Sequence, residues 1–170
     1  MLSPKKSMKS NPPWKTIVGV IGEHEACPEN YSLARNLGHL LAAGGALVVC
    51  GGLGGVMEAV SRGAKEGGGL TVGILPGTDA QEANSWVDLP IVTGMGEARN
   101  LLIVRTAEVI VAVGGEFGTL SEMAFALKMR KPVISLKSWV PEREKVKAET
   151  LYGAETVEEA VSLVWKLCGA

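Results

Sequence analysis

Residues 109–127, which read VIVAVGGEFGTLSEMAFAL, constrain the fold more than any other stretch of the chain. The five uncharged residues 109–113 are typical of a strand that is buried on both faces, as the strands of a parallel sheet are. Two glycines and then a helical segment follow them. The free N–H groups in the first turn of such a helix carry partial positive charge, so this junction is predicted to bind an anion such as phosphate.

The same unit recurs along the chain, because apolar runs alternate with amphipathic segments and glycine turns separate them. This alternation predicts an α/β, Rossmann-like, doubly wound and mostly parallel sheet of about six to seven strands, with helices on both faces. Ligands of such sheets bind beyond the carboxyl ends of the strands. The predicted strands are 16–21, 46–50, 70–75, 89–92, 109–113, 132–136 and a short one around Leu151, and the predicted helices are 31–43, 56–66, 97–107, 120–129 and 156–167.

Composition narrows the function classes. The 170 residues and 46% hydrophobic content suit a single domain over 15–170, after a predicted disordered lead over 1–14. The net charge of -1 gives no general attraction to nucleic acid or to a membrane surface. No run approaches the roughly 20 apolar residues that span a bilayer, so a cytoplasmic location is expected. Cys27, Cys50 and Cys168 form no CxxC pattern and indicate neither a disulfide framework nor a zinc site.

Two glycine-rich turns follow predicted strands, GGLGG at 51–55 and the turn before 120–129. Neighbouring turns of this kind combine into one larger anion site, although each also suits simple close packing of a helix on a sheet. The polar segment 76–88 is predicted to lie over that site. The turn after the first predicted strand lacks GxGxxG, which argues against a dinucleotide-binding protein. No P-loop motif occurs, which argues against a P-loop NTPase. The ligand-binding candidates are Gly51, Gly52, Gly54, Gly55, Gly115, Glu116, Gly118 and Thr119.

Residues 119–122 read TLSE, the T-x-x-E spacing of a helix capping box. In a capping box the Thr119 hydroxyl accepts from the backbone N–H three residues on, and the Glu122 side chain reaches back to the Thr119 N–H. Alternatively, Glu122 points into the cleft and contacts a polar ligand group. The spacing leaves both open, and 156–159 (TVEE) repeats the pattern before the last helix.

Other polar residues are less informative. Arg99 is either a surface arginine or a ligand contact. His24 follows the first strand and is placed to touch a ligand, whereas His39 is an ordinary helical residue. Neither histidine has the spacing of a metal ligand, so no metal site is predicted.

Three segments together resemble the LOG family, long mislabelled as lysine decarboxylases: CGGLGGVMEAVSRGAKEGGGLTVGILPG, GMGEARN and VIVAVGGEFGTLSEMAFALKMRKPVI. The resemblance covers about residues 15–137. Within it, LPGTDAQEAN and VDLPIVTGMGEARN look closest to the molybdenum-cofactor carrier branch.

Enzymes of the LOG family cleave the N-glycosidic bond of nucleoside 5'-monophosphates, with a PGGxGTxxE signature and an arginine. The resemblance implies that Glu122, Thr119 and Gly118 match that signature and that Arg99 is the arginine. In that chemistry Glu122 would hold the ribose hydroxyls and stabilise an oxocarbenium-like centre, with Arg99 assisting and the glycine turns binding phosphate.

The chain departs from the family signature at Gly114, Glu116 and Asn100, which replace its proline, its second glycine and the lysine after the arginine. Two unit charges at 4 Å interact by about 4 kcal/mol at an effective dielectric near 20, so an inward, ionised Glu116 would oppose a phosphate. If Glu116 points outward, the turn can still bind one.

Three functions are therefore predicted side by side. The first is a LOG-like phosphoribohydrolase acting on purine nucleoside 5'-monophosphates. The second is a non-catalytic carrier or sensor of a phosphorylated pterin- or nucleotide-like ligand, with molybdenum cofactor as cargo and no required cofactor. The third is a partner protein with a vestigial pocket. The family resemblance also implies a homodimer or higher homo-oligomer.

Overall fold

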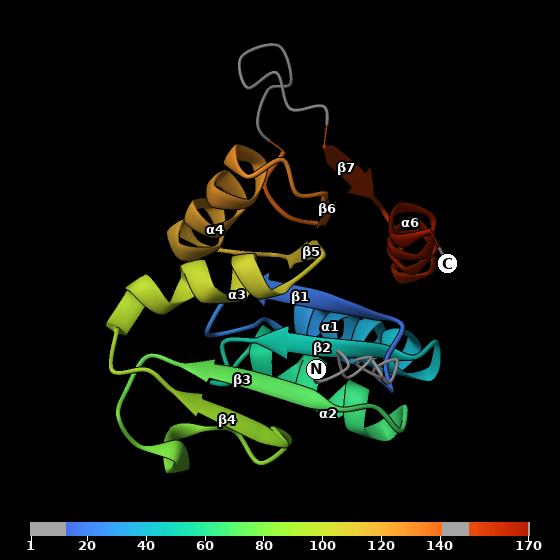
Figure 1. Cartoon of the computed structure of the whole chain (residues 1–170). Coiled ribbons are helices and arrows are strands. Elements are labelled where there is room, and N and C mark those ends of the chain that lie inside the picture. The colour runs from blue at the N-terminus through green and yellow to red at the C-terminus, as the bar shows by residue number, and fades with distance from the viewer. Residues whose placement is uncertain (1–12, 141–149, 170) are drawn as a thin grey trace, which may run out of the picture.

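The core of the protein is one sheet of seven parallel strands, seen in a computed structural model that describes residues 13–140 and 150–169. Its strand order is β4-β3-β2-β1-β5-β6-β7 (Figure 1). The predicted Rossmann-like α/β fold is thereby confirmed. The strands are β1 (Thr16–Gly22), β2 (Ala46–Cys50), β3 (Thr71–Leu75), β4 (Leu89–Val92), β5 (Val109–Val113), β6 (Val133–Leu136) and β7 (Leu151–Ala154).

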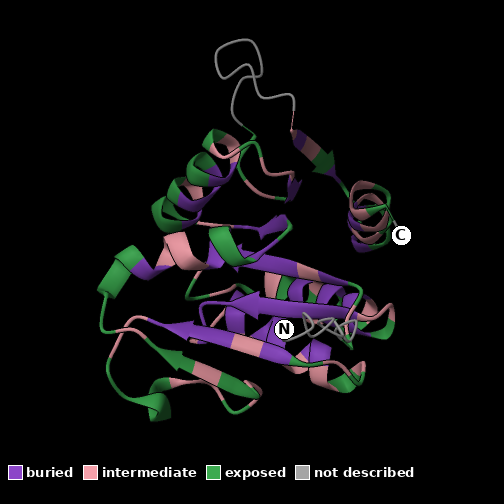
Figure 2. Ribbon diagram, in the orientation of Figure 1, coloured by how far each residue is buried: buried purple, intermediate pink, exposed green. Residues whose placement is uncertain are grey.

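Helices cover both faces of the sheet. One face packs against α1 (Pro28–Ala43), α2 (Val56–Glu66) and α6 (Val157–Cys168). The other packs against α3 (Asn100–Thr106) and α4 (Phe117–Lys128). Every residue of β2 and β5 is buried, as a strand covered on both sides must be (Figure 2).

The direction of the strand order reverses beside β1. The chain runs outward from β1 to β4 and then returns to β5, which pairs with β1 on its free side, with Val18 opposite Val109 and Gly22 opposite Val113. This reversal opens a crevice at the carboxyl ends of β1 and β5, because the connections from these two strands leave toward opposite faces.

Most predicted elements are present, with changes at their boundaries. Helix α1 begins at Pro28 rather than at residue 31, because Pro28 suits a first helical position and the Cys27 thiol accepts from the Asn30 N–H at 3.5 Å. The predicted helix 97–107 is instead the short 3-10 helix η2 (Gly96–Arg99) followed by α3. Helix α4 begins at Phe117, three residues before its predicted start.

The segment after β3 contains a second 3-10 helix, η1 (Ala80–Glu82). Asn84 ties this segment to the turn after β2: its backbone N–H donates to Gly52 O at 2.8 Å and its Nδ2 to Leu53 O at 2.9 Å. The predicted disordered lead, 1–14, lies outside the described residues apart from Pro13 and Trp14. In the part of the chain that the structure describes, no helix is long and apolar enough to cross a membrane.

Candidate functional site

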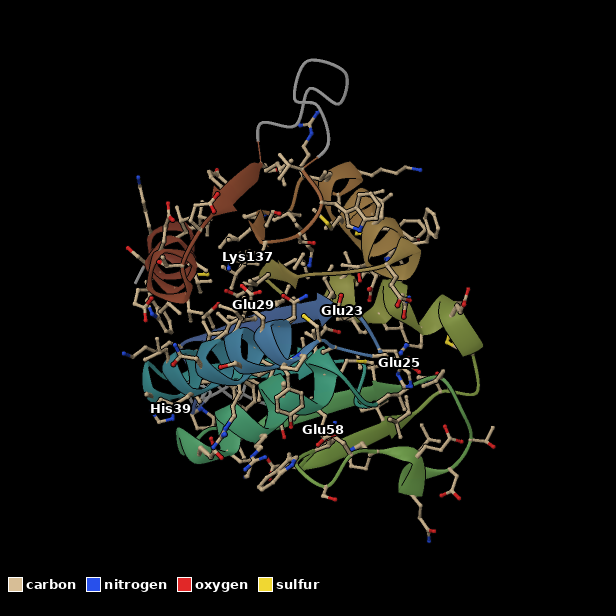
Figure 3. The ribbon with its side chains drawn as sticks, turned by 180° about the vertical axis from the view of Figure 1, so that it is seen from behind. Glu23, Glu25, Glu29, His39, Glu58 and Lys137 are labelled. Atoms are coloured by element: carbon tan, nitrogen blue, oxygen red, sulfur yellow. The ribbon has the colours of Figure 1, made fainter. Side chains whose placement is uncertain are left out.

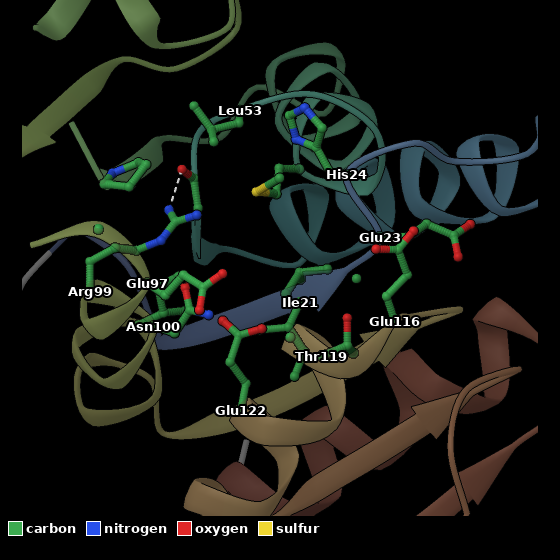
Figure 4. Close-up of a pocket in the computed structure, with 18 residues that line it drawn as sticks. Ile21, Glu23, His24, Leu53, Glu97, Arg99, Asn100, Glu116, Thr119 and Glu122 are labelled. Carbon is green, nitrogen blue, oxygen red and sulfur yellow. Dashed lines mark hydrogen bonds between the residues drawn. The ribbon is translucent and has the colours of Figure 1, made fainter.

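A cavity of about 350 Å³ lies at the carboxyl ends of β1, β2, β3 and β5, beside the reversal of strand order (Figure 4). Its walls come from the loops after these strands, from η2 and α3, and from the start of α4. Position and size both match small-molecule sites, which range over roughly 300–1,000 Å³. Polar residues that line it are Glu23, His24, Glu97, Arg99, Asn100, Glu116, Thr119 and Glu122.

Arg99 ends η2 and is a cavity residue rather than a surface arginine, with 8% of its surface exposed. Its Nη1 donates to Gly51 O at 2.5 Å and also to Ile74 O, which holds the guanidinium against the ends of β2 and β3. Its buried Nε has no partner among the described residues. Burial lowers the pKa of the guanidinium, and the Glu122 carboxylate opposes this shift. An unpartnered N–H of a buried arginine favours a ligand that accepts hydrogen bonds.

Glu122 is 6% exposed and lines the cavity from α4. Because α4 begins at Phe117, with Glu116 as its N-cap and no side-chain cap, Thr119 and Glu122 lie within the helix. The capping-box interpretation of 119–122 is therefore wrong. Burial raises the pKa of Glu122 to about 8, and the charge of Arg99 lowers it only in part. A pKa raised in this direction favours the protonated form of Glu122, which can donate a hydrogen bond into the cavity.

The structure brings together the two residues that the LOG resemblance assigns to catalysis. Arg99 and Glu122 come from different elements, η2 and α4, and both line the one cavity (Figure 4). No ion pair joins them among the residues that the structure describes. Both side chains are therefore available to a ligand in this cavity.

The turn before α4 is built tightly. Gly115 has φ 124°, and a Cβ there would lie 2.7 Å from Thr119 Cβ, so a side chain would be strained and would clash. Thr119 is 2% exposed and lines the cavity together with Gly118. Glu116 is exposed at the cavity rim, so a negative charge stands where the family signature has glycine.

The turn at residues 51–55 contributes less to the cavity than expected. Gly51 lines it, whereas Gly52, Gly54 and Gly55 are not among the described lining residues. Gly55 instead allows the close approach of the loop after β1, since a Cβ there would lie 2.3 Å from His24 O. Of the segment 76–88, predicted to cover the site, only Pro76 reaches the described lining.

Sequence reasoning missed two acidic residues of the cavity. Glu23 directly follows β1 and Glu97 lies in η2. The signal for Glu23 was available, because the carboxyl ends of all the strands meet at one edge. Together with Glu116 and Glu122, these residues bring four carboxyl groups to the lining of the cavity. Nevertheless, no group of three or more His, Cys, Asp or Glu side chains suited to a metal ion occurs within 13–140 and 150–169.

The family model described as the SLOG cluster4 family matches residues 15–161. An uncharacterised protein of Archaeoglobus fulgidus is 46% identical over 145 residues, which cover 85% of this chain and 91% of that protein. The family match confirms the predicted LOG-like resemblance.

Two solved structures are similar over nearly their whole length. The molybdenum cofactor binding protein of Rippkaea orientalis is 39% identical, covers 89% of this chain and 96% of its own, and has a TM-score of 0.83. The molybdenum cofactor carrier protein of Chlamydomonas reinhardtii is 38% identical, covers 91% and 99%, and also has a TM-score of 0.83. Both agree with the predicted closeness to the carrier branch.

Proposed function

This chain belongs to the SLOG cluster4 family, and we propose that it is a carrier that binds molybdenum cofactor, a phosphorylated pterin, in the cavity between β1 and β5 without converting it. The observation that carries the proposal is the likeness to two proteins named for that cofactor, at 38% and 39% identity and over about nine-tenths of the chain. The chemistry of the cavity supports it in two respects.

First, the cavity offers partners for both halves of such a ligand. A pterin ring presents amino and ring N–H donors, and the exposed carboxylate of Glu116 at the rim is a suitable acceptor for them. Arg99 supplies positive charge for the phosphate, and its Nε lacks a partner in the described chain. These groups can bind and orient a ligand without any bond being broken.

Second, a protonated Glu122 does not suit the role that the LOG resemblance gives this residue. An oxocarbenium-like centre is stabilised by an ionised carboxylate, whereas burial raises the pKa of Glu122 to about 8. At neutral pH most of the protein would hold Glu122 as the neutral acid. A neutral acid suits a hydrogen bond to a carbonyl or ring nitrogen of a carried ligand.

The test is direct binding of the cofactor. Purified protein is mixed anaerobically with molybdenum cofactor and passed through a gel-filtration column, and the protein fraction is assayed for molybdenum and for pterin fluorescence. We expect molybdenum and pterin to co-elute with the protein at close to equal amounts. Protein fractions that retain neither would overturn the carrier proposal.

A LOG-like hydrolase remains the second candidate, favoured by the presence of Arg99 and Glu122 in one cavity. It is tested by incubating the protein with AMP and N6-substituted analogues and assaying ribose 5-phosphate. If the protein is this enzyme, release of ribose 5-phosphate is lost in Glu122→Ala and rises with pH through about 8, as the carboxyl ionises. Release that persists in the variant would exclude the catalytic role of Glu122.

A further inference from the structure

Glu23 connects both glycine turns at the reversal of the sheet. Its Oε2 accepts from the Gly115 N–H at 3.1 Å, in the turn before α4. Its backbone carbonyl oxygen accepts from the Val56 N–H at 3.0 Å, the first N–H of α2. Asn30 Nδ2 donates to Glu23 Oε1 at 2.7 Å and holds the side chain in place. One residue therefore occupies N–H groups at both junctions where an anion was predicted to bind.

The turn before α4 is shaped around this carboxylate. Gly114 has φ 57°, and a Cβ there would lie 2.8 Å from Glu23 Oε2 and 2.4 Å from Asn30 Nδ2. Only glycine allows both groups to come so close. The carboxylate thus takes the place that a phosphate oxygen would take in a turn of this kind.

The same cavity also shows where a ligand would bind instead. Arg99 is 8% exposed and its Nε is unpartnered, and Glu122 is 6% exposed with no hydrogen-bond donor among the described residues. In the view of Figure 4, Arg99 and Glu23 lie on opposite sides of the cavity. Arg99 therefore supplies positive charge on one side of the cavity, where Glu97 of the same η2 also lies, whereas Glu23 and Glu116 place two carboxylates at the turn before α4.

From this arrangement we propose that Glu23 is a resident anion that determines specificity by keeping phosphate out of the turn before α4. The inference rests on the proposed function, because it takes this cavity to be the ligand site. A ligand then places N–H or O–H donors against Glu23 and its phosphate toward Arg99. With Glu23 in place, the two glycine turns present hydrogen-bond acceptors to a ligand instead of free N–H groups that would bind an anion.

Inorganic phosphate is the probe that tests Glu23 by itself. It is titrated at constant ionic strength into four ¹⁵N-labelled proteins: wild type, Glu23→Ala, Glu23→Gln and Glu25→Ala. Glu25 is the matched control, since it carries the same charge in the same loop and is exposed outside the cavity lining (Figure 3). Glu23→Gln removes the charge and keeps an acceptor for the Gly115 N–H, so it serves if Glu23→Ala fails to fold.

We expect Glu23→Ala to bind phosphate about ten-fold or more tighter than wild type, with a large shift of the Gly115 amide signal, and Glu23→Gln to show a smaller gain. Wild type and Glu25→Ala should bind equally weakly and leave the Gly115 amide unshifted. Equal phosphate affinity in wild type and both Glu23 variants would overturn the proposal. So would an equal gain in Glu25→Ala, because the effect would then be one of overall charge.

The outcome is separable from that of the carrier proposal. A gain of phosphate binding in Glu23→Ala supports the role of Glu23 even if the wild-type protein retains no molybdenum cofactor, in which case only the carrier function fails. If the protein retains the cofactor but the Glu23 variants bind phosphate no more tightly than wild type, the carrier proposal stands and the proposed role of Glu23 fails.

Discussion

Two segments of the chain share the T-x-x-E spacing and differ in what they do. In 156–159, Thr156 is the N-cap of α6, and its Oγ1 accepts from the Glu159 N–H at 3.2 Å, while the Glu159 carboxylate accepts from the Glu155 N–H at 2.9 Å. In 119–122, the threonine and glutamate lie inside α4, both buried, and both line the cavity.

The difference teaches that spacing defines a cap only once the start of the helix is known. Thr156 has extended backbone angles and directly precedes α6, whereas Thr119 comes after α4 has already begun at Phe117. Shifting the start of the helix by three residues frees Thr119 and Glu122 from capping. The same T-x-x-E spacing then lines the cavity in one place and caps a helix in the other.

The largest expected contrast is in the pH dependence of stability. The pKa of Glu122 is raised from 4.5 to about 8 in the folded protein, so the folded state binds the proton more tightly. The contribution of Glu122 to stability should be complete below its unfolded pKa of about 4.5 and should be lost, by an amount on the order of a few kcal/mol, as pH rises to about 8. Urea unfolding at several pH values measures this fall.

The matched variants for this measurement are Glu122→Gln and Glu159→Gln. Glu122→Gln cannot ionise and should lose little stability over that pH range. Its free energy of unfolding, relative to that of wild type, should therefore increase with pH. Glu159→Gln should follow the wild-type curve. A wild-type curve parallel to that of Glu122→Gln would show that Glu122 is not a buried acid.

The next contrast is in ligand binding. Glu122→Ala removes a buried donor and should weaken binding of molybdenum cofactor about 10- to 100-fold. Glu122→Gln keeps an N–H donor in the same place and should bind within about three-fold of wild type, since the change in hydrogen bonding is small. Gel filtration with molybdenum analysis compares the variants. Glu159→Ala should not weaken cofactor binding. If it weakens binding as much as Glu122→Ala does, the division of roles between the two segments is contradicted.

The smallest expected effect is on the cap of α6. Thr156→Ala removes the acceptor for the Glu159 N–H and should lower the free energy of unfolding by about 1 kcal/mol, without a change in ligand binding. Thr156→Ser retains the hydroxyl oxygen and should recover most of that loss. Thermal or urea unfolding of wild type and the two variants measures this loss. If Thr156→Ala is as stable as wild type, the Thr156 hydroxyl does not stabilise the helix as a cap.

Much of the fold could be predicted because it depends on local patterns. Uncharged runs such as 109–113 and the helical periodicity between them indicate strands and helices, and their alternation indicates a parallel sheet. Helix boundaries were less accurate, as the early starts of α1 at Pro28 and α4 at Phe117 show. The start of α1 depends on Pro28 and a single capping contact, and α4 begins without a side-chain cap, so neither start follows from a repeated pattern.

The candidate site was predicted only in part. Arg99, Gly115, Gly118, Thr119 and Glu122 were chosen from the sequence, and all lie at or beside the cavity. The position of Glu23 directly after β1 indicated a lining residue that was overlooked, whereas its contact with Gly115 could not be predicted because it joins residues far apart in the chain. Both glycine turns were expected to bind phosphate, but the Glu23 carboxylate already accepts a hydrogen bond from the turn before α4.

By itself the sequence determined the class of fold, the family and the edge of the sheet at which the cavity lies, since each of these follows from hydrophobic periodicity or from contiguous motifs. Only the tertiary structure decided that Glu122 is a buried acid rather than a cap, that Arg99 keeps an unpartnered N–H, and that Glu23 fills the turn before α4. The reason is that burial and partnership depend on which distant segments the fold brings together, and no local pattern records them.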